Sequence, residues 1–169
     1  DIDLSTVSAT NNWTPIGYFI GYYFRGMFDG LGHTISNLHI NNSSIENNIG
    51  LFGRTENVDK IANINLTNVD ITGMYHVGAL VGTAIRTHIE NVSSSGKVVG
   101  VFRVGGLVGY MTESPVTLLK SHSSADVSGT GDIGGLVGEL VRSAIRESYS
   151  TGKITGTGSN IGGIVGYSD

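Results

Sequence analysis

The sequence contains no cysteine, and only 14% of its 169 residues are charged. Without cysteine the chain has no disulfides and no thiolate metal ligands. Charged residues usually make up about 25% of a soluble domain. The formal net charge is −4, and lysine and arginine are scattered along the chain. Because no basic stripe is available to a phosphate backbone, we expect no nucleic-acid partner.

Long apolar runs and a secretion signal are also missing. The longest apolar stretches, such as residues 77–81, are a few residues long, whereas a membrane-spanning helix needs about 20. We therefore expect no membrane span. Residues 1–30 lack a basic start followed by an apolar segment, which is the pattern of a signal peptide. The chain opens in mid-pattern, and we expect a mature product or a fragment of a longer protein.

Glycine and β-branched residues are abundant instead. The chain has 26 glycines, about twice the usual share. Valine, isoleucine, threonine, serine and asparagine are frequent, while lysine, glutamate, alanine and leucine are scarce. This balance disfavours helices and favours strands. The composition predicts an all-β fold.

The chain repeats itself. Five similar glycine-ended blocks occupy residues 50–53, 78–82, 105–109, 134–138 and 162–166, and their last residues are Gly53, Gly82, Gly109, Gly138 and Gly166. These glycines are 29, 27, 29 and 28 residues apart. A second glycine-ended series and a polar segment lie between the blocks, so each unit has about three short strands. Units of this length bury a core only by stacking. We predict a β-solenoid (β-helix) of about six coils, with ~28 residues per coil.

Two features of the repeat predict how the coils stack. The recurring glycines are expected at corners, where the backbone needs either a positive φ or an approach that a Cβ would obstruct. One column alternates in charge, as Asp70, Lys97, Asp126 and Lys153, and an isoleucine or valine follows each member. Alternation along a strand places these charges outside and the aliphatic residues inside. Opposite charges on neighbouring coils support this register.

The blocks resemble the GLUG repeats of bacterial cell-surface proteins, which are named for a Gly-Leu-aliphatic-Gly core. Residues 12–17 and 24–38 are similar to the segment that often leads into such repeats. Related repeats occur in adhesin-like proteins and in non-catalytic parts of immunoglobulin A metallopeptidases. The resemblance implies a secreted or surface β-solenoid. Peptidase activity is not implied, because the sequence has no His-Glu-x-x-His zinc motif.

Candidate catalytic and metal-binding residues are sparse. The five histidines fall in different coils, and a metal site needs several ligands that converge, so we expect no metal and no cofactor. Asp70 and Asp126 share a column two coils apart, roughly 9–10 Å, near the upper carboxylate spacing of inverting glycosidases. Lys97 is expected between them, which argues against catalysis. Asp29 and His33 fit a turn better than an acid–base pair.

Aromatic residues cluster near the start of the chain. Trp13, Tyr18, Tyr22, Tyr23 and Phe24 lie within a short segment. They have two interpretations, a cap that packs on the first coil or a surface that stacks on sugars or anchors a protein partner.

Together these observations predict a single β-solenoid domain over residues 1–169, with an aromatic-rich N-terminal coil or cap at 1–34 and GLUG-type repeats at 35–169. We expect a non-enzymatic structural or adhesive segment of a secreted or surface bacterial protein, located outside the cell or on its surface. Its protein or glycan partner is not specified by the sequence, and copies could stack end to end into filaments. The alternative is a polysaccharide-binding or polysaccharide-processing β-helix, because fold alone does not exclude that chemistry.

Overall fold

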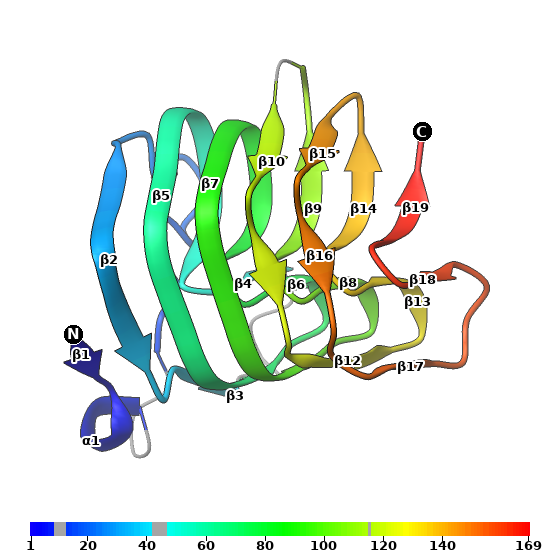
Figure 1. The fold of residues 1–169 in the computed structure, drawn as a ribbon, viewed down its shortest axis with the longest axis horizontal. Helices are drawn as coiled ribbons and strands as arrows, with labels where there is room; N and C mark the ends of the chain where they lie inside the picture. Colours follow the sequence, from blue (N-terminus) through cyan, green and yellow to red (C-terminus); the bar gives the residue numbers. More distant parts are fainter. Residues whose placement is uncertain (9–12, 42–46, 115) are drawn as a thin grey trace.

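The computed structural model describes residues 1–8, 13–41, 47–114 and 116–169, and the chain winds through them as a stack of coils (Figure 1). Nearly all regular structure is strand, apart from the short helix α1 (Ser5–Ser8). Strands in successive coils pair in parallel along the whole stack. The predicted all-β solenoid is confirmed.

Two sheets form the walls of the stack. The larger contains β1 (Ile2–Asp3), β2 (Phe28–Ser36), β3 (His39–Asn41), β5 (Phe52–Thr72), β7 (Val81–Val99), β9 (Val108–Thr112), β10 (Thr117–Leu119), β11 (His122–Ser123), β12 (Asp126–Gly129), β14 (Val137–Val141), β15 (Ala144–Arg146), β16 (Tyr149–Ser150), β17 (Ile154–Gly156) and β19 (Val165–Ser168). The smaller contains β4 (Asn47–Ile49), β6 (Tyr75–Gly78), β8 (Phe102–Gly105), β13 (Gly131–Gly134) and β18 (Ile161–Gly162).

The stack has about five turns of ~28 residues, rather than the six obtained by dividing chain length by period. The difference lies before β2, where the chain joins the stack irregularly. Isolated bridges from Ile16 to Phe52 and from Phe24 to Thr55 connect this region to β5. The single-domain organisation with a division at residue 34 stays a prediction; β2 spans that position.

The corners are turned by residues with left-handed backbone conformations. In β5 these are Asn57, Asn63 and Asn68, with φ of 53°, 56° and 53°. Asparagine tolerates this region better than most residues. Because the ladder continues through these corners, the expected short strands merge into single curved strands of 21 residues in β5 and 19 in β7.

Corner residues of successive coils form columns, and their side chains bond along the stack. Asn68 Nδ2 donates to Asn37 Oδ1 at 2.6 Å, and Asn91 Nδ2 donates to Asn63 Oδ1 at 2.8 Å. Four columns follow from the strand register: Asn37 and Asn68; Asn48, His76, Arg103 and Asp132; Asn57, Arg86, Glu113 and Arg142; and Asn63, Asn91, Lys120 and Glu147. These bonds offset part of the cost of the left-handed conformation, about 1–3 kcal/mol per residue.

The core is one continuous apolar column. Leu80, Leu107 and Leu136, from three glycine-ended blocks, are fully buried. The backbone N–H of Leu80 donates to the carbonyl of Leu107 at 2.9 Å, and that of Leu107 donates to Leu136 at 3.0 Å. The blocks therefore bind neighbouring coils through both the apolar side chain and the backbone.

The last glycine of each block accommodates a corner of the preceding coil. A Cβ on Gly82 would lie 2.4 Å from the backbone of Asn48, and one on Gly109 would lie 2.4 Å from that of His76. Gly138 and Gly166 approach Arg103 and Asp132 in the same way, and Gly53 approaches Tyr18 at 3.0 Å. Of the two reasons anticipated for these glycines, the structure shows close approach and no positive φ.

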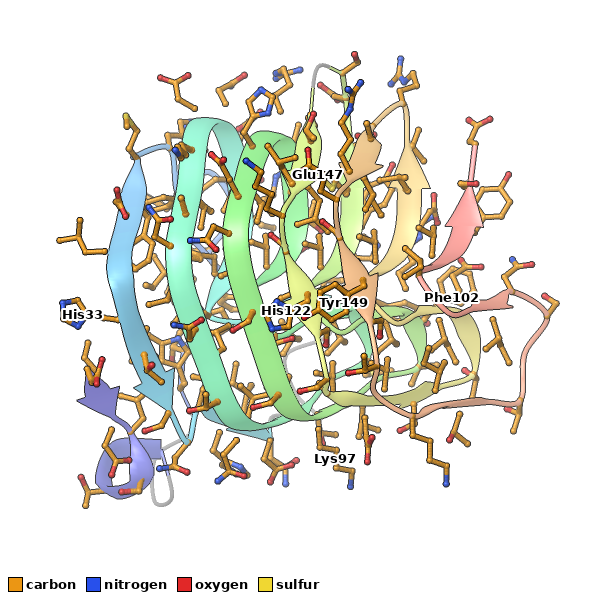
Figure 2. All side chains as sticks on the ribbon, in the orientation of Figure 1. His33, Lys97, Phe102, His122, Glu147 and Tyr149 are labelled. Carbon is orange, nitrogen blue, oxygen red and sulfur yellow. The ribbon has the colours of Figure 1, made fainter. Side chains whose placement is uncertain are left out.

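The alternating charge column stacks as expected. Asp70 pairs in register with Lys97, and Lys97 pairs with Asp126. The backbone N–H of Lys153 donates to Asp126 Oδ1 at 3.0 Å. All four side chains are exposed, and Lys97 points away from the stack (Figure 2).

Candidate binding cleft

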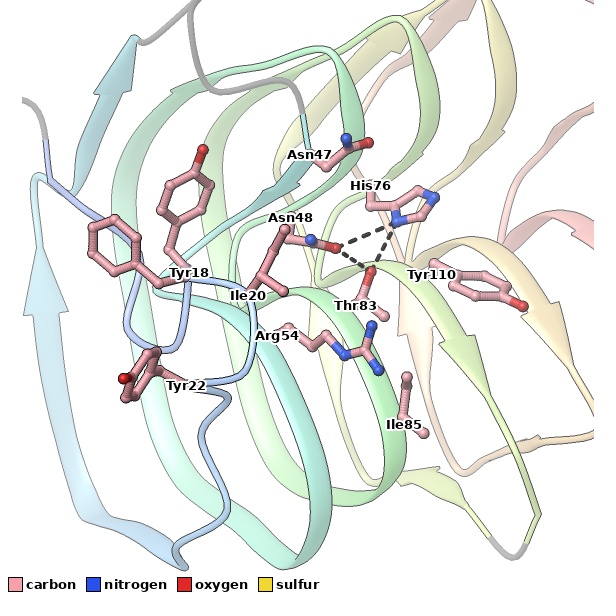
Figure 3. Close-up of a pocket in the computed structure, with 11 residues that line it drawn as sticks. Tyr18, Ile20, Tyr22, Asn47, Asn48, Arg54, His76, Thr83, Ile85 and Tyr110 are labelled. Carbon is pink, nitrogen blue, oxygen red and sulfur yellow. Dashed lines mark hydrogen bonds between the residues drawn. The ribbon is translucent and has the colours of Figure 1, made fainter.

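An open cleft of about 1060 Å³ lies between the N-terminal loop, residues 13–27 before β2, and the first coils (Figure 3). Its lining comes from the loop before β2 and from β4, β5, β6, β7 and β9. The lining residues are Tyr18, Phe19, Ile20, Tyr22, Asn47, Asn48, Arg54, His76, Thr83, Ile85 and Tyr110.

The loop is held in place by two aromatic anchors. Phe24 packs on Phe52 with ring centroids 4.7 Å apart, and Trp13 Nε1 donates to the carbonyl of Leu51 at 3.2 Å. Between these anchors the chain bulges outward, with positive φ at Gly17 and Gly21. The bulge projects the remaining large side chains toward the solvent and the cleft.

One wall of the cleft is a hydrogen-bond chain across three coils. Arg103 Nη1 donates to His76 Nε2 at 2.9 Å, and His76 Nδ1 lies 2.8 Å from Thr83 Oγ1. Thr83 Oγ1 donates to Asn48 Oδ1 at 2.6 Å. Since Arg103 donates to Nε2 and Thr83 donates to Asn48, the network assigns the proton to Nδ1 of a neutral imidazole.

The charge state of His76 agrees with this network. Burial, together with the nearby Arg103 and Arg54 guanidinium groups, lowers its pKa from 6.5 to about 4. His76 is therefore neutral at pH 7 and supplies no positive charge to the cleft.

Arg54 carries the uncompensated charge of the cleft. Its guanidinium lies over the Tyr23 ring, 4.1 Å from the centroid. Among the described residues no carboxylate lies within ion-pair distance of it, whereas Arg25 bonds Glu56 at 2.8 Å and Arg103 bonds Glu139 at 2.5 Å. The Arg54 Nε atom is buried, and among the described residues it has no hydrogen-bond partner.

The structure divides the five aromatic residues that the sequence singled out. Trp13, Tyr18 and Phe24 pack against the core, Tyr18 also lines the cleft together with Tyr22, and Tyr23 stacks on Arg54. Packing and an accessible surface thus occur together in one segment.

Sequence reasoning missed the residues that the repeats contribute to the cleft. Arg54, Thr83 and Tyr110 each follow the last glycine of a block, and the register places them side by side. Aligning the repeats at that glycine is the signal that could have found them.

The other candidate residues do not converge. Asp70 and Asp126 are exposed, with Lys97 between them in the register. Asp29 Oδ1 accepts from the backbone N–H of Leu31 and from Asn63 Nδ2, both at 2.9 Å, and these bonds lower its pKa. This is a turn.

No group of three or more His, Asp or Glu that could hold a metal ion occurs in the described part of the chain. Within the same ranges no helix is long and apolar enough to cross a membrane.

Comparison with known proteins places the repeat in a family. Residues 73–99, which run from the end of β5 through β6 and β7, match the family described as the GLUG motif. This segment is a GLUG motif.

The chain as a whole is similar to parts of longer proteins. It is 39% identical over 164 residues to halomucin from Haloquadratum walsbyi, a match that covers 97% of the chain and 2% of halomucin. It is 29% identical over 174 residues to an immunoglobulin A1 protease from Streptococcus pneumoniae, covering 90% of the chain and 9% of that protease. The chain thus spans a small fraction of these relatives.

A solved structure shares the fold. The crystal structure of a Bacteroides ovatus protein assigned to the immunoglobulin A1 proteases superposes with a TM-score of 0.81. The alignment covers the whole of this chain and 53% of the other, at 20% sequence identity. At that identity the similarity establishes the fold alone.

Proposed function

We propose that this GLUG-repeat chain is a non-enzymatic structural or adhesive β-solenoid segment of a secreted or surface protein. The uninterrupted parallel stack is the observation that carries the proposal, because its corners, glycines and buried leucines all serve contacts between coils. The relatives support it as well, since the similar region is 2% of halomucin and 9% of a streptococcal protease. Such a region is a minor structural part of a large protein.

The arrangement of carboxylates supports a non-catalytic role. Glycoside hydrolysis needs two carboxyl groups that face one bond, one of them a proton donor. Asp70 and Asp126 are both exposed, and Lys97 separates them on the ladder.

A turnover assay tests this part of the proposal. The protein is incubated with acidic and neutral polysaccharides, and new reducing ends are measured. No turnover is expected. Turnover that disappears in Asp70→Asn or Asp126→Asn would instead establish a polysaccharide-processing enzyme.

End-to-end association of copies into filaments is part of the same proposal. Ile161 and Ile164 are 43% and 36% exposed, whereas the equivalent Ile133 and Leu136 one coil earlier are fully buried. A second copy stacked on this rung would cover the exposed pair. Light scattering at increasing concentration should show association that Ile164→Lys abolishes, and a strict monomer would contradict it.

A further inference from the structure

We propose that the cleft beside the N-terminal loop binds a sugar that carries a carboxylate. This deepens the adhesive part of the proposed function and rests on it, while the structural role of the stack does not depend on it.

Arg54 supplies the charge that selects an anion. Its side chain reaches across the cleft toward Thr83 and Ile85 (Figure 3), and no carboxylate among the described residues neutralises it. Stacking on Tyr23 holds the guanidinium plane in a fixed orientation, which reduces the entropy lost when a ligand binds. A planar guanidinium matches a carboxylate with two parallel hydrogen bonds.

The loop supplies an aromatic face. Phe19 and Tyr22 are 65% and 80% exposed, and Tyr18 lines the same wall. Tyr18 and Phe19 pack edge to face, with ring centroids 5.4 Å apart, and exposed large side chains that gather in one place often mark a binding site. A tyrosine ring offers an apolar face with a polar edge, which suits the C–H face of a sugar ring and its surrounding hydroxyls.

The opposite wall supplies neutral polar groups. Asn47 and Asn48 carry amides that both donate and accept, and Tyr110 adds a hydroxyl. Asn48 Oδ1 is already occupied by Thr83, which leaves the Asn48 amide N–H groups oriented by the network. Groups of this kind bond hydroxyls without adding charge.

This set of groups favours an acidic sugar over other anions. A phosphate-rich ligand would call for several cations, and the cleft lining contains one arginine and no lysine. The volume of about 1060 Å³ lies just above the range of roughly 300–1,000 Å³ for small-ligand sites. An oligosaccharide with one carboxylate near Arg54 would fill the cleft and contact its aromatic wall and its amide wall.

Calorimetric titration tests the proposal with defined probes. The titrants are trimers of galacturonic, glucuronic and mannuronic acid and a sialylated trisaccharide, each with its neutral counterpart, and a tripeptide with a free carboxylate. At least one acidic sugar should bind about tenfold or more tightly than its neutral counterpart, as expected for a charge-assisted hydrogen bond. Arg54→Gln should remove that difference.

Two further variants separate binding from folding. Tyr22→Ala, at an exposed position, should weaken binding about fivefold and leave the melting temperature unchanged. Arg146→Gln makes the same chemical change as Arg54→Gln on an exposed residue of β15 and should leave binding intact.

Three results would overturn the proposal: no binding by any acidic sugar at millimolar concentration, equal binding of acidic and neutral sugars, or tighter binding of the tripeptide. None of these results would affect the proposed structural role of the stack. Melting experiments test that role, and the turnover assay tests whether the chain is an enzyme.

Discussion

At the scale of single residues, the fold depends on how closely neighbouring coils approach. Gly135 and Gly163 are the second glycines of successive blocks, but their surroundings differ. A Cβ on Gly135 would lie 2.2 Å from the carbonyl oxygen of Gly163, while one on Gly163 would meet nothing within 4 Å. The same substitution at these two positions therefore isolates the effect of the contact.

We expect Gly135→Ala to lower the free energy of unfolding by about 1–3 kcal/mol, because overpacking forces the backbone to shift. For a chain of this length that corresponds to a melting temperature lower by roughly 3–10 °C. Gly163→Ala is the matched control and should change stability by less than about 0.5 kcal/mol. Equal melting temperatures for the two variants, measured by circular dichroism, would show that coil approach does not limit this position.

His76 gives the fold a pH dependence. Its pKa is lowered from 6.5 to about 4 by burial, Arg103 and Arg54, so the unfolded chain binds a proton there more readily than the folded chain. This contribution to stability is fully present above pH 6.5 and is lost as pH falls toward 4, to an extent of order 3 kcal/mol. Glu139, paired with Arg103, and Tyr110 also face this network.

His76→Asn tests that sign. Asparagine already occupies the equivalent corner at Asn48, with φ of 64°, so the backbone conformation is tolerated. The variant should lose most of the decline in stability between pH 6.5 and 4, measured by urea unfolding at each pH. His88→Asn, at an exposed site, should keep the decline. An unchanged slope in His76→Asn would refute the assignment.

At the scale of strands and corners, the sequence predicted what repeats and missed what varies. Three features could be predicted from the sequence: the period, the glycine-ended blocks and the pairing of Asp70 with Lys97. Each of them depends on residue types that recur at fixed spacing. The columns of corner residues with positive φ could not be predicted from the sequence. Their members include Asn63, Lys120 and Glu147, and such a column has no common residue type because the backbone conformation and the side-chain bonds decide it.

Only part of the cleft could be predicted, because the rest depends on contacts that do not recur along the sequence. Tyr18 and Tyr22 stood out as part of an aromatic cluster, but the position of their loop depends on two irregular bridges, at Ile16 and Phe24. No periodic pattern encodes such contacts. Arg54 could not be predicted as a site residue, because what distinguishes it is the lack of a nearby carboxylate among the described residues, and only the structure shows that.

The charge column gives a prediction for the register of β5, β7 and β12. Lys97 lies between Asp70 and Asp126, so Lys97→Glu places three carboxylates in a row. Each like-charge contact costs about 0.2–1 kcal/mol, and salt screens the repulsion. The variant should melt below Lys97→Gln at low salt and approach it at 1 M salt. A Lys97→Glu protein as stable as Lys97→Gln at low salt would argue against this register.

At the scale of the whole molecule, the stack combines a regular structural part with one irregular end. The coils from β5 onward repeat the same corner, glycine and leucine contacts, whereas the cleft forms where the non-repeating N-terminal loop meets them. On the larger sheet the rings of His122 and Tyr149, from neighbouring coils, stack in parallel with centroids 4.9 Å apart (Figure 2). In the proposed function the repeats supply the scaffold, and the loop together with the neighbouring coils supplies the binding cleft.

The in-register stack is the central claim, and the distance between Lys97 and Lys153 tests it most directly. Both side chains are exposed, and two coil spacings separate their backbones by about 10 Å. Spin labels on cysteines at these two positions should give dipolar broadening in continuous-wave electron paramagnetic resonance, with a narrow distribution below about 20 Å once label length is included. A distribution centred well beyond that distance, or no broadening, would contradict the stacked solenoid.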